Sequence, residues 1–290
     1  MPTLFCFGLG YSAQVFAQHL TAEGWDIHGT CRDSGKAADL DRAGFTAHLF
    51  DGAAPLSEEG RAALARADAV LASIPPDREG RDPALVHHAG DLADGAARWI
   101  GYLSTTGVYG DHGGAWVDET TPVSPATARG ARRVAAERAW LELHETYSKP
   151  VHVFRLAGIY GPGRNPLAGL RAGQARRIVK PGHVFSRIHV ADIARVLAAS
   201  LARPQPGAVY NVCDDLPAPS SEVTEYAADL LGVAPPPAIP FEEAEMSTMA
   251  RSFYADNKRV SNRRIRDDLG VALAYPDYRA GLEALLAAGE

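Results

Sequence analysis

Short apolar runs alternate with longer amphipathic segments along the first half of the chain. The short runs end at Gly, Asp or Pro, as buried strands do, and the Ala-rich segments between them repeat apolar residues about every 3.6 positions, as helices do. Strands are expected at residues 3–8, 25–31, 45–50, 67–74, 99–105 and 151–157, with helices such as 11–24 and 57–67 between them. Near-continuous apolar strands joined by helices predict a parallel sheet covered on both faces, which is a doubly wound α/β fold.

The second half of the chain is less regular. Residues 161–190 are rich in Gly and Arg and end in an expected strand, residues 190–203 have a helical pattern, and residues 208–215 resemble one more buried strand. Beyond Pro217, helical patterns alternate with a Pro-rich link at residues 232–240. These features predict a smaller, mainly helical C-terminal lobe beside the sheet.

Composition is that of a soluble protein with a sizeable core, since 46% of the 290 residues are hydrophobic and 22% are charged. A formal net charge of −6 favours neither nucleic acid nor an anionic membrane as a partner. The three cysteines lie in apolar strand-like runs, where we expect reduced core residues and no metal site or disulfide. There is no basic leader and no apolar run near the roughly 18 residues of a membrane span, so we expect a cytoplasmic protein.

A glycine-rich turn follows the first expected strand and opens the first expected helix. Gly8, Gly10 and Ala13 in FGLGYSA have the GxGxxG/A spacing. Gly8 permits a tight turn, Gly10 lets the backbone approach a pyrophosphate, and Ala13 allows the helix to pack closely on the strand. The helix N-terminus adds N–H groups that bind anions. In this context the spacing predicts a dinucleotide site rather than a purely structural turn.

The end of the second expected strand indicates which dinucleotide is bound. An acidic residue there would accept a hydrogen bond from the 2′-hydroxyl of NAD, but this chain has Thr30 and Arg32 in GTCRD. The Arg32 guanidinium can pair with a 2′-phosphate through two parallel hydrogen bonds. The alternative is that Arg32 is a solvated surface residue and the neighbouring Asp33 serves a 2′-hydroxyl. We favour NADP(H) over NAD(H).

Further motifs follow in order along the chain: LFDG, YLSTTGVYG, PATARGARRVAAERAW, FRLAGIYGPGR, RIHVADIARVLAASL, YNVCDD and LGVALAYPDYRAGL. With the glycine turn, they resemble the extended short-chain dehydrogenase/reductase family, also called the NAD-dependent epimerase/dehydratase family. The resemblance spans essentially the whole chain and is strongest to an atypical bacterial branch whose substrates are mostly unassigned. It implies a Rossmann domain of residues 1–161 plus 187–215 and a substrate lobe of residues 162–186 plus 216–290.

The resemblance also assigns roles to single residues. It places Asp51 near the adenine, and Ser73, Ile74 and Pro75 where the fourth strand approaches the cofactor. Thr105 matches the catalytic Ser/Thr. The residues implied at the substrate are Thr106, Arg129, Tyr160 and Arg164, of which Tyr160 and Arg164 belong to a YGPGR loop near the nicotinamide. His189 and Asp192 match the segment that ties the substrate lobe to the Rossmann core.

The segment from residue 125 to residue 140 departs from the family pattern. Counting back from Glu137 places Arg129 at the position of the family's tyrosine and Arg133 at that of its lysine. The family uses the tyrosine as its acid–base group, which an arginine cannot replace because it stays protonated. Arg133 can still donate to the cofactor's ribose or phosphate. Because the two arginines are spaced i, i+4, they share a helix face, and form either a clamp for an anionic ligand or part of a solvated surface.

Three function classes are open. The first is an oxidoreductase or epimerase that acts on a polar, phosphorylated or nucleotide-linked small molecule with a non-standard acid–base group. Sugar dehydration is not expected, because Thr106 and Gly107 replace the acidic pair of the dehydratases. The second is a non-catalytic NADP(H)-binding sensor or regulatory subunit, and the third is a scaffold that binds nothing. The family also implies a homodimer through a four-helix bundle of residues 84–98 and 131–145, although both segments would equally suit packing on the sheet.

Overall fold

The computed structural model describes the backbone of residues 1–290 and every side chain except that of residue 249. The chain forms two compact units. The first consists of Met1–Thr105, Ala128–Arg155 and Ala194–Tyr210. The second consists of Thr106–Thr127, Leu156–Ile193 and Asn211–Glu290. Within the described residues, no helix combines the length and the apolar character that crossing a bilayer requires.

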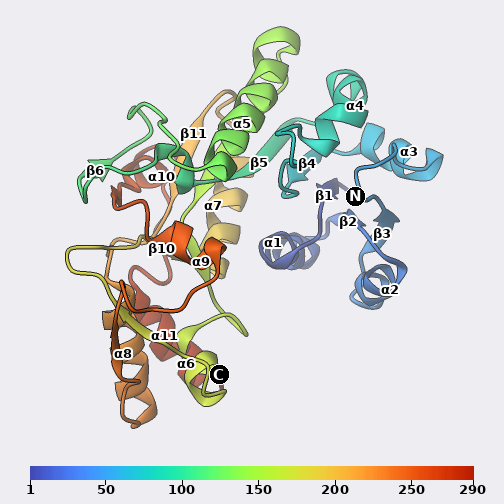
Figure 1. The fold of residues 1–290 in the computed structure, drawn as a ribbon. Coiled ribbons are helices and arrows are strands. Elements are labelled where there is room, and N and C mark those ends of the chain that lie inside the picture. Colours follow the sequence, from blue (N-terminus) through green and yellow to red (C-terminus); the bar gives the residue numbers. More distant parts are fainter. The chain divides into compact units, whose positions relative to one another are not determined.

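A seven-stranded sheet has the strand order β11–β7–β5–β4–β1–β2–β3 (Figure 1). Its strands are β1 (Thr3–Phe7), β2 (Asp26–Cys31), β3 (Thr46–Leu49), β4 (Ala69–Ala72), β5 (Trp99–Thr105), β7 (Val151–Leu156) and β11 (Val209–Val212). Strand β1 runs parallel to both of its neighbours, β2 and β4, and the pairs β2–β3 and β4–β5 are also parallel. The predicted doubly wound α/β fold is confirmed, with each expected strand of the first half in place.

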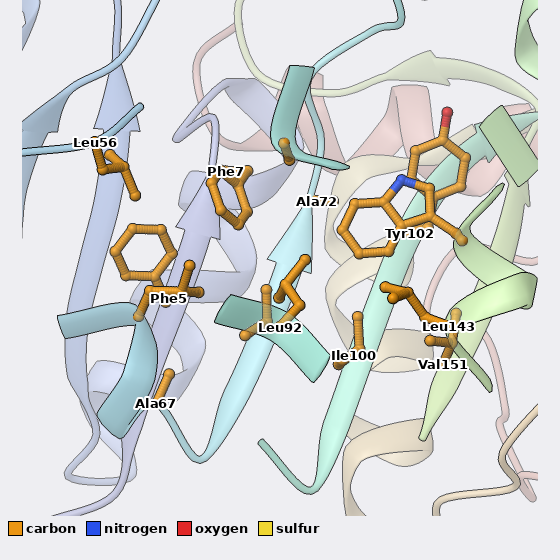
Figure 2. Packing of buried hydrophobic residues seen from close by; sticks show 14 of the residues in the cluster. Phe5, Phe7, Leu56, Ala67, Ala72, Leu92, Ile100, Tyr102, Leu143 and Val151 are labelled. Atoms are coloured by element: carbon orange, nitrogen blue, oxygen red, sulfur yellow. The ribbon is translucent and has the colours of Figure 1, made fainter. Parts of the chain in front are cut away.

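Helices connect the strands, because parallel neighbours need a crossover. They are α1 (Tyr11–Ala22), α2 (Ser34–Arg42), α3 (Glu58–Arg66), α4 (Pro83–Asp94), α5 (Ala128–Tyr147) and α7 (Val190–Ala202). Side chains of α3, α4 and α5 join alternate residues of the strands in one buried cluster, whose members include Phe5, Phe7, Leu92, Tyr102 and Leu143 (Figure 2). On the opposite strand face, Phe16 of α1 packs against Trp99, whose indole N–H donates to Ser200 of α7 at 3.0 Å.

The second unit has a smaller core and shorter elements. Its helical elements are η1 (Thr106–Tyr109), α6 (Pro166–Arg171), α8 (Ser220–Leu231), α9 (Thr248–Phe253), α10 (Arg263–Asp267) and α11 (Tyr278–Ala287). Its strands form three parallel pairs: β8 (Gly158–Tyr160) with β10 (Arg187–His189), β9 (Arg177–Val179) with β12 (Ala238–Pro240), and β6 (Trp116–Val117) with β13 (Arg259–Val260). Tyr160, Leu167, Val223, Tyr278 and Leu282 lie in its apolar cluster. This cluster packs α6, α8 and α11 against β8.

A buried ion pair fixes α5 on the sheet. The Arg155 guanidinium on β7 donates to both carboxylate oxygens of Glu137 on α5, with the shortest bond at 2.8 Å. Ser104 on β5 donates to the same carboxylate at 2.5 Å. The two charged side chains are 9% and 4% exposed. Two strands and one helix are therefore joined by one carboxylate in a water-poor environment.

Removing the Glu137 charge should destabilise the protein strongly. In Glu137→Gln, the Arg155 guanidinium stays buried without a counter-ion, and breaking such a pair costs about 3–5 kcal/mol. Urea unfolding of the variant measures this loss. The control is Arg42→Ala, which breaks an ion pair with Asp39 whose side chains are 77% and 57% exposed, and should cost less than about 1 kcal/mol. Equal losses in the two variants would contradict the role given to the buried pair.

Candidate functional site

The glycine turn leaves the N-terminus of α1 uncovered. Gly8 has φ +90°, a conformation that favours glycine, and a side chain there would meet Ile74 at 2.7 Å. Gly10 is the N-cap residue of α1 and offers no side chain to cap its first N–H groups. Apart from its chain neighbours, no atom of the described residues lies within 4 Å of a Cβ placed at Gly10. Ala13 is buried, as close packing of the helix requires. The first turn of α1 can therefore receive an anionic ligand at close range.

Two hydroxyl side chains from neighbouring strands hold this turn. The buried Thr30 at the end of β2 accepts from the Gly8 N–H at 2.7 Å. Ser73, directly after β4, donates to the Gly8 carbonyl at 2.5 Å. Since β2 and β4 flank β1, these bonds lie where the chain order of the sheet reverses, which is where open α/β sheets bind ligands. The structure thus brings Gly8, Thr30 and Ser73 together.

Arg32 and Asp33 have different environments after β2. Arg32 is exposed and has no hydrogen bond or ion pair with other described residues. Asp33 is the N-cap of α2, and its carboxylate accepts from the Lys36 N–H at 2.8 Å. One of the two predicted ribose contacts is therefore engaged in capping a helix. The other is available to solvent or a ligand.

The remaining predicted cofactor residues lie after β3 and β4. Asp51 is exposed, and its carboxylate accepts from the Ala53 N–H at 2.9 Å in a local turn. Pro75 is exposed two residues beyond Ser73. Nothing in their local geometry assigns a ligand contact, and both assignments stay predictions.

The α5 arginines have different surroundings. Arg129 is exposed in the first turn of the helix, whereas Arg133 is partly buried. The Arg133 guanidinium donates to the Leu103 carbonyl at 2.6 Å and lies 5.7 Å from the centre of the Tyr102 ring. Arg133 is thus fastened to β5 two residues before Thr105, which is partly buried at the end of that strand. The anion clamp stays a prediction.

In the second unit, the YGPGR segment forms a tight turn between β8 and α6. Gly161 and Arg164 exchange two backbone hydrogen bonds of 3.0 Å. Tyr160 is buried below the turn, and its hydroxyl donates to the Asp277 carbonyl at 3.3 Å. Burial raises the pKa of Tyr160, which opposes ionisation at neutral pH. Arg164 is exposed, and Thr106 is partly buried where η1 begins.

His189 and Asp192 of the RIHVAD motif contact the segment that precedes α11 within the second unit. The buried Asp192 carboxylate accepts from the Ala274 N–H at 2.7 Å and from the Tyr275 N–H at 2.9 Å. His189 packs against the Tyr275 ring at 4.1 Å between centres. These contacts fix the irregular segment that leads into α11.

Comparisons with known proteins agree with this architecture. A family model described as "NAD dependent epimerase/dehydratase family" matches residues 85–213. Protein YeeZ of Escherichia coli (strain K12) is 31% identical over 290 residues, which cover 96% of this chain and 97% of that protein. The chain belongs to the NAD-dependent epimerase/dehydratase family.

Two solved structures are similar to this family member over its whole length. A functionally unknown conserved protein from Silicibacter pomeroyi DSS has 52% identity and a TM-score of 0.89, with 100% of both chains covered. A dTDP-glucose 4,6-dehydratase from Bacillus anthracis str. Ames, solved in complex with NAD, has a TM-score of 0.77 at 16% identity, with 99% of this chain and 96% of that chain covered. At that identity the second comparison supports the fold alone.

Sequence reasoning missed one buried ionisable group in the second unit. Asp214, two residues beyond the end of β11, is 1% exposed, and both carboxylate oxygens lack a hydrogen-bond partner among the described residues. Burial raises its pKa to about 8, which the nearby Arg187 opposes only in part. The residue also borders a hollow of about 320 Å³ whose lining includes Trp116, Asn262 and Arg266. The sequence does show two adjacent aspartates in YNVCDD. It does not show which of them is buried, and in the structure Asp214 is buried whereas Asp215 is exposed.

Ionisation of Asp214 should lower the free energy of unfolding as the pH rises from 3.8 to about 8. Because its pKa is raised from 3.8 to about 8, its contribution is fully present below the lower value and is lost as pH rises through the upper value. Between them the loss is about 1.4 kcal/mol per pH unit. Asp214→Asn removes the titration, so thermal unfolding should favour the variant increasingly from about pH 5 to pH 8. Parallel curves for the two proteins would show that the carboxyl does not titrate in this way.

Proposed function

We propose that this protein binds NADP(H) in preference to NAD(H) and uses it as an oxidoreductase or epimerase. The observation that carries the proposal is the uncovered N-terminus of α1 at Gly10, beside a Gly8 turn held by Thr30 and Ser73. A pyrophosphate fits this arrangement because it needs backbone N–H donors and no intervening side chain. When bound, the nicotinamide supplies hydride transfer, and the protein supplies binding and orientation.

The residues after β2 support NADP(H). Asp33 caps α2, which leaves it less suited to accept from a 2′-hydroxyl. Arg32 is exposed, and its planar fork matches the two oxygens that a 2′-phosphate presents. We therefore expect the site to distinguish NADP(H) from NAD(H) by the negative charge of the 2′-phosphate on the adenosine ribose.

An anionic substrate is supported by a cationic and aromatic surface in the second unit. The Phe241 ring lies 4.8 Å from the Lys180 ammonium and 5.0 Å from the Arg251 guanidinium carbon. Lys180 also donates to the Tyr254 carbonyl, and the Tyr254 ring packs on Phe241 at 5.2 Å between centres. Two cations fixed beside two aromatic rings suit a phosphorylated or nucleotide-linked molecule, through charge and stacking.

Within the reaction, Thr105 is proposed to hydrogen-bond the reacting hydroxyl or carbonyl. Arg129 and Arg133 are proposed to hold negative charge on the substrate or the cofactor, since neither can accept a proton at neutral pH. Tyr109 does not supply the missing group, because it is buried and donates to Asn211 at 2.8 Å. We therefore expect slow proton transfer through water, a deficit of about 10²–10⁴-fold relative to a positioned acid–base group.

The second candidate is a non-catalytic NADP(H) sensor or regulatory subunit. It is favoured by the arginine at the position of the family's acid–base tyrosine and by the burial of Tyr109 and Tyr160. Incubation with NADP(H) and phosphorylated sugars or carbonyl compounds separates the candidates, because only an enzyme converts a substrate. A net redox reaction is followed by the change in NADPH, and an epimerisation, which consumes no cofactor, by the conversion of the substrate itself. Either form is proposed to act in the cytoplasm as a homodimer through α4 and α5, on which Val86 and Tyr147 are 51% and 57% exposed.

Arg32→Ala should weaken NADPH binding about 10–100-fold, because charged hydrogen bonds to the 2′-phosphate contribute about 1.5–3 kcal/mol. NADH binding should change little, since NADH has no phosphate there. Calorimetric titration of each variant with each dinucleotide measures both effects. Arg66→Ala, an exposed residue at the end of α3, controls for the loss of one positive charge. An equal loss of NADPH and NADH affinity would rule out the 2′-phosphate contact.

A further inference from the structure

The turn between β8 and α6 presents two hydrogen-bond donors side by side. Gly163 has φ +68° at the tip of the turn, closed by the paired bonds of Gly161 and Arg164. Asn165 caps α6 with its side-chain oxygen, which accepts from the Ala168 N–H at 3.0 Å. This cap orients the amide nitrogen, which donates to the Gly161 carbonyl at 3.0 Å. The amide nitrogen also donates to a second acceptor, a carboxylate oxygen of Glu290.

Both donors are occupied by a carboxylate of the same chain. The Gly163 N–H is 3.0 Å from each oxygen of the Glu290 side chain, and the Asn165 amide nitrogen is 2.9 Å from one of them. The contact holds Glu290 in its ionised form, because hydrogen bonds from Gly163 and Asn165 lower the pKa of that carboxyl. One anion therefore satisfies two neutral donors.

The end of α11 places Glu290 there. Gly289 has φ +95°, and the Glu290 N–H donates to the Leu285 carbonyl at 3.0 Å while the Gly289 N–H donates to that of Leu286 at 3.0 Å. This is the Schellman arrangement, in which a left-handed glycine reverses the chain and satisfies the last helical carbonyls. Arg171 on α6 also reaches the Gly289 carbonyl at 3.5 Å. Glu290 is thus positioned by backbone structure and not by chance side-chain contact.

We propose that the Gly163 N–H and the Asn165 amide form an anion-binding site which Glu290 occupies in the free protein and from which a phosphoryl group displaces it. The inference rests on the proposal that this protein binds a phosphorylated or nucleotide-linked substrate. A phosphate oxygen accepts from the same two donors and brings more charge than a carboxylate. The Glu290 carboxylate both competes for the donors and repels the incoming group, so the site is self-inhibited.

The size of the effect follows from the exposure of the contact. Gly163 is exposed and Glu290 is partly exposed, so solvent screens the charge of the internal ligand. Solvent also competes for the donors, so an exposed contact of this kind binds its carboxylate only weakly. Removing the competitor should therefore strengthen phosphate binding by roughly 3–10-fold.

The test is a titration with inorganic phosphate, followed at the Gly163 backbone amide by NMR. Glu290→Gln keeps the shape of the side chain and removes its charge, so the variant should bind phosphate roughly 3–10-fold more tightly than the natural protein. Glu283→Gln, on the same helix, removes an equal charge from a carboxylate that accepts from Tyr226, and should leave the affinity unchanged. Asn165→Asp keeps the cap oxygen but replaces the donor with a carboxylate, and should abolish binding at Gly163.

Equal phosphate affinities in the natural protein and in Glu290→Gln would overturn the inference, as would the absence of any phosphate-dependent shift at Gly163 in both. An equal gain in Glu283→Gln would also overturn it, since the effect would then be one of net charge. A parallel titration with NADPH, followed at the Gly10 amide, reports on the proposed function independently. NADPH binding without a Glu290 effect leaves that function intact, whereas a Glu290 effect without NADPH binding retains the anion site alone.

Discussion

The buried pair of Glu137 and Arg155 is the constraint on which the candidate site depends. Two charges removed from water are stable only when geometry and additional bonds compensate for lost hydration. Here the guanidinium contacts both carboxylate oxygens and Ser104 supplies another donor. The arrangement is possible only when α5 lies in one position and one rotation on β5 and β7. Hydrophobic packing alone would tolerate a sliding helix more readily.

That fixed position determines what the end of β5 can present. Ser104 is bound to Glu137, and the Leu103 carbonyl receives the Arg133 guanidinium at 2.6 Å. Thr105 follows immediately, so the strand that leads to it is held by two side chains of α5. At the end of β1, Gly8 is held by Thr30 and Ser73, which lie at the ends of the two strands beside β1 in the sheet, β2 and β4. The Gly8 turn and the end of β5 are therefore each held by hydrogen bonds of polar side chains.

Much of the first unit was predictable because its signals are local. Strand 99–105 matches β5 residue for residue, and the glycine spacing placed Gly8 and Gly10 between β1 and α1. Long-range contacts were not predictable. The sequence does not show that Asp33 caps α2, that Arg133 bonds the Leu103 carbonyl, or that Asp214 is buried without a hydrogen-bond partner among the described residues. The Glu290 contact with Gly163 spans 127 positions, and no periodic pattern encodes it.

The most direct measurement is a calorimetric titration of NADPH into the cofactor-free protein and into its Gly10→Ala variant. A Cβ at Gly10 meets none of the described atoms within 4 Å beyond its chain neighbours, so the variant should unfold at the same temperature as the natural protein. Its methyl group would nevertheless stand where the backbone is expected to approach the pyrophosphate. We expect micromolar or tighter NADPH binding that is lost in the variant. Failure of the natural protein to bind NADPH, or equal binding by both, would contradict a pyrophosphate site at the Gly8–Gly10 turn.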